Sequence, residues 1–371
     1  MDKKFVMGIA AMAALTLVSC SSDDLDSFSD NSSKNEAISF DSYWGRSAVA
    51  VNGTRGSVET KETLKTKGFG VFSKYTGTAT FPEFDNQKVT CPGTKWTYTP
   101  LKFWPTNGEI NFYAYAPYKE NQKLKENATT FDFTVADNAA GQEDLLWANA
   151  KGQITAGLTN TKEKVKIHFY HALSRLGYSV KLSGDYSSSS SNVTFTLNKI
   201  TLAGSADGTT KNAFYKTGTI DLAKATNVAD LWDTSSSSTN DGKQNFPWVS
   251  SDKPVNNTGI ENAKTDYLFV IPQDFSKAKT TENPNVDELY VIVKYTIDYG
   301  SGVKQENTVY KQIKKKFEQG KAYMLNLTIG LPIEFDVNVD VTGGVGVEDW
   351  GQDEKINIGS GSNDNLWDGI E

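Results

Sequence analysis

Short runs in which apolar and polar residues alternate recur along most of this chain. Turn residues such as glycine, asparagine and proline separate them at intervals typical of β-strands. Helical periodicity extends nowhere beyond a few turns, although residues 171–176 could form one helical turn. We therefore expect an all-β protein. The expected strands cover residues 37–40, 68–72, 95–104, 110–116, 131–135, 164–170, 193–202, 267–271, 288–299, 303–313 and 322–329.

The clearest alternation covers residues 333–341. Five apolar side chains share one face of this expected strand: Ile333, Phe335, Val337, Val339 and Val341. A strand with one apolar face needs a hydrophobic groove to lie in. This segment is therefore either the last strand of its own domain or a candidate donor strand that fills a groove in a neighbouring molecule. Residues 351–371 are either a disordered tail or an alternative donor segment.

The length of the chain indicates two domains, because single cores of more than about 250 residues tend to split. The sequence has 371 residues, and 12% of them are aromatic, which favours β structure. We expect two tandem antiparallel β-sandwich domains, covering residues 37–160 and 161–350. Residues 20–36 are too polar to pack and are expected to form a flexible tether.

The first residues have the pattern of a secretory signal. Lys3 and Lys4 precede an apolar run over residues 5–18, which is shorter than the ~20 residues of a membrane-spanning helix. Residues 17–20, Leu-Val-Ser-Cys, resemble the lipobox of bacterial lipoproteins. That resemblance implies a signal peptide over residues 1–19 and a lipid on Cys20 that holds the protein at the outer membrane. The alternative is an ordinary signal peptide with an incidental cysteine.

Composition argues against several other classes of function. The formal net charge of -7 gives the chain no electrostatic reason to bind nucleic acid. The only two histidines, His168 and His171, are spaced so that a strand would not place both on one face, which favours packing over a metal site. Nucleotide-binding and hydrolase motifs are absent from the sequence. We therefore expect neither enzymatic activity nor a cofactor.

Eight phrases together resemble the fimbrillin-like family, the subunits and anchors of type V pili. They are TLKTKGFGVFSKYTG (63–77), KFWPTNGEINFYAYAPY (102–118), QEDLLWANAKG (142–152), VKIHFYHALSRLGYSVKL (165–182), ITLAGSADGTT (200–210), DYLFVIPQDF (266–275), FEQGKAYMLNLTI (317–329) and VGVEDW (345–350). The resemblance covers nearly all of residues 37–350.

The resemblance implies two transthyretin-like sandwiches and export as a lipidated precursor. In polymerising members an Arg-specific protease removes the first strand, and the terminal strand of a neighbouring subunit fills the groove. This is β-augmentation, in which main-chain hydrogen bonds and alternate side chains join two chains. The implied partners are other pilus subunits, the maturation protease, outer-membrane lipid at Cys20, and a ligand on a host or bacterial surface.

The distribution of arginine suits such a cut. The chain holds three arginines, Arg46, Arg55 and Arg175, and the first two directly follow the first expected strand. We place Arg55 ahead of Arg46 as the cleavage site because it lies in the turn-like sequence Asn-Gly-Thr-Arg-Gly, whose glycines would let the loop extend into a protease cleft.

The leading hypothesis is a structural subunit of a surface fimbrium that supports adhesion. One alternative is an uncleaved, lipid-anchored protein that anchors or caps the fibre. A second is a surface glycan-binding lipoprotein, in which Trp232 and Trp248 would stack on sugar faces. Aromatic residues also fill the cores of β-sandwiches, and we favour that explanation for both tryptophans.

Overall fold

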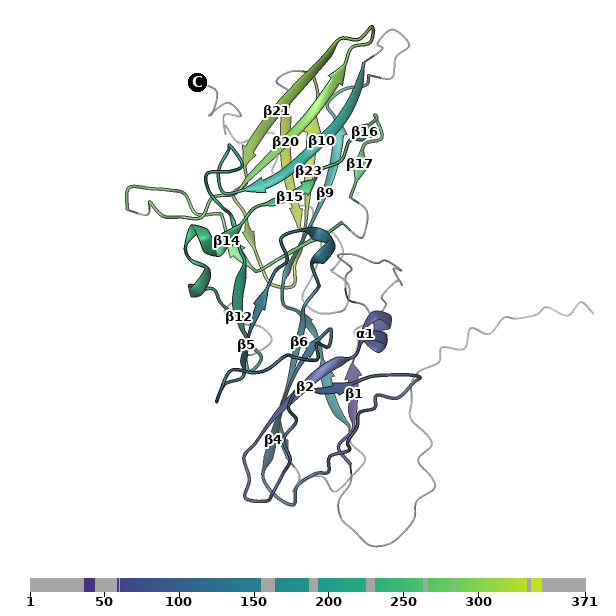
Figure 1. Ribbon diagram of the computed structural model, residues 1–371, viewed down its shortest axis with the longest axis vertical. Helices are drawn as coiled ribbons and strands as arrows, with labels where there is room; N and C mark the ends of the chain where they lie inside the picture. Colours follow the sequence, from purple (N-terminus) through teal and green to yellow (C-terminus); the bar gives the residue numbers. More distant parts are fainter. Residues whose placement is uncertain are drawn as a thin grey trace, which may run out of the picture. The chain divides into compact units, whose positions relative to one another are not determined.

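The computed structural model describes residues 37–43, 59, 61–154, 164–186, 193–224, 231–262, 266–282, 284–331 and 335–341. Within these ranges the chain is almost entirely β-structure, which confirms the expected fold class, and its only α-helix is α1 (Lys61–Lys67) (Figure 1). No helix in the same ranges is both long and apolar enough to span a bilayer. Cys20, Arg46, Arg55 and Ile333 lie outside the described residues.

The first half of the chain forms one antiparallel sheet and one small parallel pair. The antiparallel sheet has the order β3-β2-β4-β6-β8. Its strands are β3 (Gln87–Val89), β2 (Phe69–Tyr75), β4 (Glu109–Ala116), β6 (Leu146–Ile154) and β8 (Tyr170–His171). The parallel pair joins β1 (Phe40–Tyr43) to β7 (Val165–His168). Both strands of this pair contribute to the same core as the sheet.

Strand β4 shows that this sheet is buried on both faces. Ile110, Phe112 and Ala114 belong to a first core, whereas Tyr113 and Tyr115 belong to a second. Successive side chains of a strand point to opposite faces, so an apolar run such as residues 110–116 must be covered on both sides. The first core consists of Ile38, Phe40, Leu64, Phe69, Val71, Phe84, Val89, Tyr98, Ile110, Phe112, Ala114, Ala116, Leu146, Ala148, Ala150, Val165, Ile167 and Phe169.

The second half contributes two further sheets, each five-stranded like the first, and their buried side chains meet in the second core. One has the order β15-β10-β20-β21, and Figure 1 shows β10, β20 and β21 side by side; the other has the order β17-β9-β23-β24. The first sheet comprises β15 (Phe246–Val249), β10 (Thr194–Ala203), β20 (Tyr290–Asp298) and β21 (Lys304–Gln312), with β16 (Lys253–Val255) also on β10. The second comprises β17 (Ile260–Glu261), β9 (Ser174–Leu182), β23 (Ala322–Ile329) and β24 (Phe335–Val341), with β18 (Leu268–Val270) also on β9.

Shorter pairings complete the fold. Strand β5 (Thr130–Thr134) pairs with β12 (Thr217–Asp221), so a strand from before residue 160 hydrogen-bonds to one after it. The division into domains at residues 37–160 and 161–350 remains a prediction. The other short strands are β13 (Trp232–Asp233), β11 (Phe214–Tyr215), β14 (Lys243–Gln244), β19 (Gln273–Asp274) and β22 (Lys316–Phe317), and the 3-10 helices are η1 (Ala139–Gly141), η2 (Ser235–Ser237) and η3 (Asn240–Gly242).

Three local expectations were wrong. Residues 95–104 do not form a strand and make only isolated bridges, at Thr97 and Phe103, since Pro100 between them has no N–H for a ladder. The expected helical turn over residues 171–176 is instead the end of β8 and the start of β9. The sheets are also not wholly antiparallel, because β1 pairs with β7 and β9 with β23 in parallel.

Candidate assembly site around the first strand

Two buried side chains fix the first strand in the protein. Ile38 and Phe40 are 1% and 3% exposed and both belong to the first core. The Phe40 ring lies 5.5 Å from the ring centroids of Phe84 and Phe112 and 5.6 Å from that of Tyr98. Burying side chains of this size stabilises a fold by roughly 1.5–3 kcal/mol each. Both residues therefore lie on one buried face of the segment, as alternate positions of an extended chain do.

The backbone of this segment is bonded on both sides. On one side β1 runs parallel to β7, in register from Phe40 opposite Val165 to Tyr43 opposite His168. On the other side the Ile38 N–H donates to the Lys102 carbonyl at 2.8 Å, and the Tyr98 hydroxyl donates to the Ile38 carbonyl at 2.7 Å. The segment of residues 37–43, which ends in β1, therefore fills a slot between β7 and residues 98–103. We call this arrangement the β1 slot.

The chain is anchored again a short distance after β1. Glu59 is 2% exposed, and its N–H donates to an Asp144 carboxylate oxygen at 2.9 Å. The Thr63 hydroxyl donates to the Glu59 carboxylate at 2.7 Å, and Lys67 forms an ion pair with the same group. The other Asp144 oxygen lies 2.9 Å from the His171 ring nitrogen. No pattern in the sequence predicts this anchor, because its members are spread over more than a hundred residues.

Burial raises the pKa of Glu59 above its ordinary value of 4.5, and the Lys67 ammonium opposes that rise only in part. The folded state therefore holds the Glu59 proton more tightly than the unfolded chain does. This residue's contribution to stability is fully present below pH 4.5, the ordinary pKa of the group, and is lost as pH rises through its raised pKa.

We expect Glu59→Gln to become progressively more stable relative to the wild type as pH rises from about 4.5 towards neutral. Denaturant unfolding of both proteins across that range measures the difference. Glu62→Gln is the control, because Glu62 is an exposed residue of α1, the helix that follows Glu59. A relative stability that falls with rising pH would show that the ion pair with Lys67, rather than burial, governs Glu59.

The third arginine is held in a central strand. Arg175 pairs through the backbone of β9 with Phe269 of β18 and Ala322 of β23, and its guanidinium carbon lies 4.4 Å from the Tyr267 ring centroid. A protease binds its substrate as an extended, accessible chain, and a paired central strand does not offer one. Arg175 is therefore protected in the folded protein.

The candidate donor residues lie mainly in β24. Phe335, Val337, Val339 and Val341 are all in this strand, which pairs antiparallel with β23 from Phe335 opposite Ile329 to Val341 opposite Tyr323. Val339 is 6% exposed, and Val337 is partly buried against the second core. This arrangement matches the expectation that the segment is the last strand of its own sheet.

The two tryptophans considered for glycan binding pack into the protein. Trp248 is 9% exposed, packs edge-on against Tyr178 and donates its indole N–H to the Asp266 carbonyl. Trp232 packs against Phe133 and donates to the Ala172 carbonyl. Trp248 therefore presents no ring face on which a sugar could stack, and the indole N–H groups of both are committed to the backbone.

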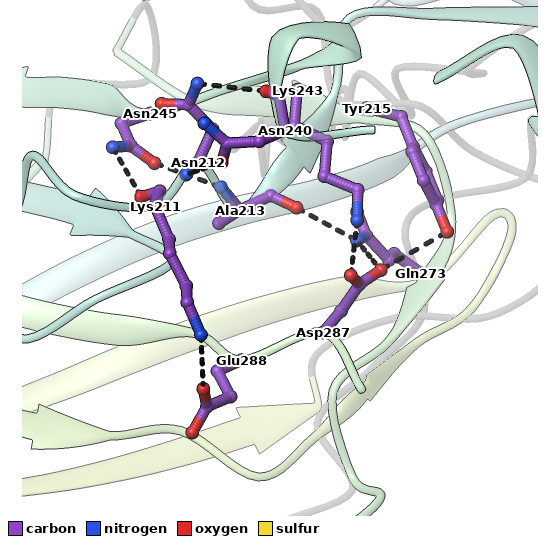
Figure 2. A network of polar contacts seen from close by, with 10 residues as sticks. All are labelled: Lys211, Asn212, Ala213, Tyr215, Asn240, Lys243, Asn245, Gln273, Asp287 and Glu288. Carbon is purple, nitrogen blue, oxygen red and sulfur yellow. Dashed lines mark hydrogen bonds and ion pairs between the residues drawn. The ribbon is translucent and has the colours of Figure 1, made fainter. Parts of the chain in front are cut away.

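A second polar cluster lies in the other half of the chain (Figure 2). Asp287 forms an ion pair with Lys243 and accepts hydrogen bonds from Gln273 at 2.7 Å and Tyr215 at 3.3 Å. Burial, reinforced by the Asp287 charge, raises the pKa of Tyr215. These contacts engage the Asp287 carboxylate with three donors and join residues of the short strands β11, β14 and β19. The described residues contain no group of three side chains suited to hold a metal ion.

Known proteins match this chain over most of its length. The model of the fimbrillin-like family matches residues 54–350. The chain belongs to the fimbrillin-like family. This confirms the resemblance found in the sequence and places the protein among structural proteins of surface fimbriae, a family not known for catalysis.

Two individual relatives of this fimbrillin-like protein are informative. The fimbrium subunit Fim1C of Phocaeicola vulgatus is 30% identical over 202 residues, which are 48% of this chain and 51% of the relative. The chain thus spans about half the length of that curated relative. A solved structure of a fimbrial protein from Bacteroides vulgatus aligns with 16% identity over 83% of this chain and 99% of its own, with a TM-score of 0.53. That likeness supports the fold.

Proposed function

We propose that this fimbrillin-like protein is a structural fimbrial subunit, exported as a lipoprotein and assembled by strand exchange after an arginine-directed cut. In this proposal Cys20 carries the lipid that holds the precursor at the outer membrane. Cleavage after Arg55, or less favourably Arg46, removes the segment that contains β1. Other subunits and an Arg-specific protease are the partners.

The position of β1 is the observation that carries the proposal. The strand inserts Ile38 and Phe40 into the first core, yet Arg46 and Arg55 separate it in sequence from the Glu59 anchor. A cut in this interval would separate β1 from the rest of the chain. The new N-terminal segment would stay bound to the fold through the contacts of Glu59. The packing of Arg175 in β9 supports a cut directed to the other two arginines.

The empty slot would have a strong tendency to be refilled. Loss of β1 exposes the rings of Phe84, Tyr98 and Phe112 and leaves the Lys102 carbonyl without its β1 partner. Uncovered apolar surface and unpaired backbone groups are both unfavourable in water. A strand with apolar residues at alternate positions from a neighbouring subunit restores both kinds of contact.

We propose residues 333–341 as the donor strand, with Ile333, Phe335, Val337, Val339 and Val341 entering the slot of the neighbour. Strand β24 is the last strand in the order of its sheet and is joined to it through β23. Release of the donor therefore requires the loss of one antiparallel ladder. In exchange, the apolar side chains of the donor strand would contact the aromatic side chains that line the slot of the neighbouring subunit.

Intact-mass spectrometry of the protein recovered from the surface of its own cells tests the proposal. A chain that starts at Gly56, or at Ser47, supports cleavage before assembly. A chain that starts at an acylated Cys20 would instead identify an uncleaved anchor or cap, and the strand-exchange mechanism would have to be withdrawn for its first strand.

A further inference from the structure

Four lysines surround the β19–β22 ribbon. These strands pair antiparallel, with Gln273 opposite Phe317 and Asp274 opposite Lys316, and the Phe275 N–H donates to the Lys315 carbonyl at 3.0 Å. The segments that follow β19 and precede β22 therefore lie together and bring Lys277 beside residues 314–316. Lys277, Lys314 and Lys316 are exposed, and Lys315 is half-buried. We call this group the lysine ribbon.

The two acidic residues of the ribbon are already engaged. Burial opposes ionisation of Asp274, but hydrogen bonds from Ser276 and the charges of Lys277 and Lys316 outweigh it and hold the pKa of this carboxyl below its usual value. Glu318 forms ion pairs with Lys321 at 2.6 Å and with Lys316 of the ribbon itself at 3.9 Å. The ribbon therefore presents an excess of positive charge on a chain whose formal net charge is -7.

Strand β24 ends beside this ribbon. Its last residue, Val341, lies opposite Tyr323 of β23. The Tyr323 ring is 4.8 Å from the ring of Phe317 in β22, and its hydroxyl accepts a hydrogen bond from the Glu318 N–H at 2.8 Å. The last described residue of β24 therefore pairs with a residue that contacts Phe317, the direct neighbour of Lys316 in the sequence.

The continuing segment carries the opposite charge. Residues 342–371 contain seven acidic residues and one lysine. The first acidic pair, Glu348 and Asp349, comes seven residues after Val341, and an extended chain of that length reaches on the order of 25 Å. Tethering places these carboxylates near the ribbon at a high effective concentration.

We propose that the acidic residues of segment 342–371 bind the lysine ribbon of their own chain. The occupant is the segment itself because it begins at the ribbon and matches it in charge. A single pair of opposite charges at an exposed surface contributes little binding free energy, but the contributions of several tethered pairs add. This inference does not depend on the proposed function, since it requires neither cleavage nor assembly.

Zero-length carbodiimide cross-linking of the purified full chain, followed by mass spectrometry, tests the inference. We expect amide cross-links between the carboxylates of the segment and Lys277, Lys314, Lys315 or Lys316. Their yield should fall severalfold at 1 M salt, where the Debye length shrinks from about 10 Å at 0.1 M to about 3 Å. A mixture of isotopically light and heavy chains shows whether each cross-link forms within one chain.

Two internal controls sharpen this test. Lys123 and Lys294 are exposed lysines of other strands and loops, so they should not cross-link to the segment above background. A variant with Glu348→Lys, Asp349→Lys, Asp353→Lys and Glu354→Lys leaves the described fold unchanged and reverses the charge of the segment. Cross-links from the unaltered Asp364, Asp368 and Glu371 to the ribbon should then also fall severalfold.

Three results would overturn the inference. They are equal cross-linking to Lys123 and Lys294, an unchanged yield from Asp364, Asp368 and Glu371 in the charge-reversed variant, and cross-links found only between light and heavy chains. The last result would assign the lysine ribbon to a second copy of the chain.

Discussion

Phe40→Ala will lower the free energy of unfolding by about 3–5 kcal/mol in the uncleaved chain, the range found when a buried phenylalanine is truncated. Phe40 is 3% exposed, and three aromatic rings surround it at 5.5–5.6 Å. Its loss leaves a cavity in the first core that these rings can close only by moving together. Denaturant unfolding of both proteins measures the change.

Phe103→Ala is the matched control for this prediction. Phe103 takes part in a bridge with Ala37 at the same slot, but its side chain is 46% exposed. We expect this change to cost less than about 1 kcal/mol, since little surface is removed from water. Equal effects of the two substitutions would mean that β1 is not anchored through Phe40.

The second large effect concerns assembly. If Arg55 is the cleavage site, Arg55→Lys will abolish polymer formation, because lysine keeps the positive charge but is not a substrate for an arginine-specific protease. The recovered chain should then retain the residues before Gly56. Electron microscopy of the cell surface and intact-mass spectrometry measure the two outcomes together.

Arg175→Lys serves as the control for the cleavage prediction. It makes the same chemical change in β9, where the backbone is paired on both sides, so fibres should form normally. Fibres that persist in Arg55→Lys but disappear in Arg46→Lys would move the cut to Arg46. Normal fibres in both single variants and in the double variant would contradict arginine-directed assembly.

The lipidation, cleavage and donor predictions rest on sequence. Cys20, Arg46, Arg55 and Ile333 lie outside the described residues, so their roles come from local sequence and from family membership. The structure adds the β1 slot, whose contents make the cleavage hypothesis physically specific. It also adds the Glu59 anchor, which no pattern in the sequence indicated.

Features that depend on neighbouring residues could be predicted from the sequence alone. Alternation located β10, β20, β21 and β23 closely, because a strand alternates its side chains between two faces whatever its partners are. The expected strands 288–299 and 303–313 are joined by a short turn in which Gly300 and Gly302 adopt positive φ angles of 80° and 83°. Family membership followed from the order of short phrases along the chain.

Which strands lie together could not be predicted from the sequence and is visible only in the tertiary structure. Strand β9 was missed although Leu176, Tyr178, Val180 and Leu182 alternate with polar or small residues, because its first residues were read as a possible helical turn. Its position between β18 and β23 is visible only in the structure. The pairing of β1 with β7 joins residues more than a hundred positions apart, and the Glu59 anchor joins Glu59 to Asp144, which is 85 positions away and in turn contacts His171. Such contacts depend on which surfaces the whole chain can bury at once, and no local pattern of residues encodes that choice.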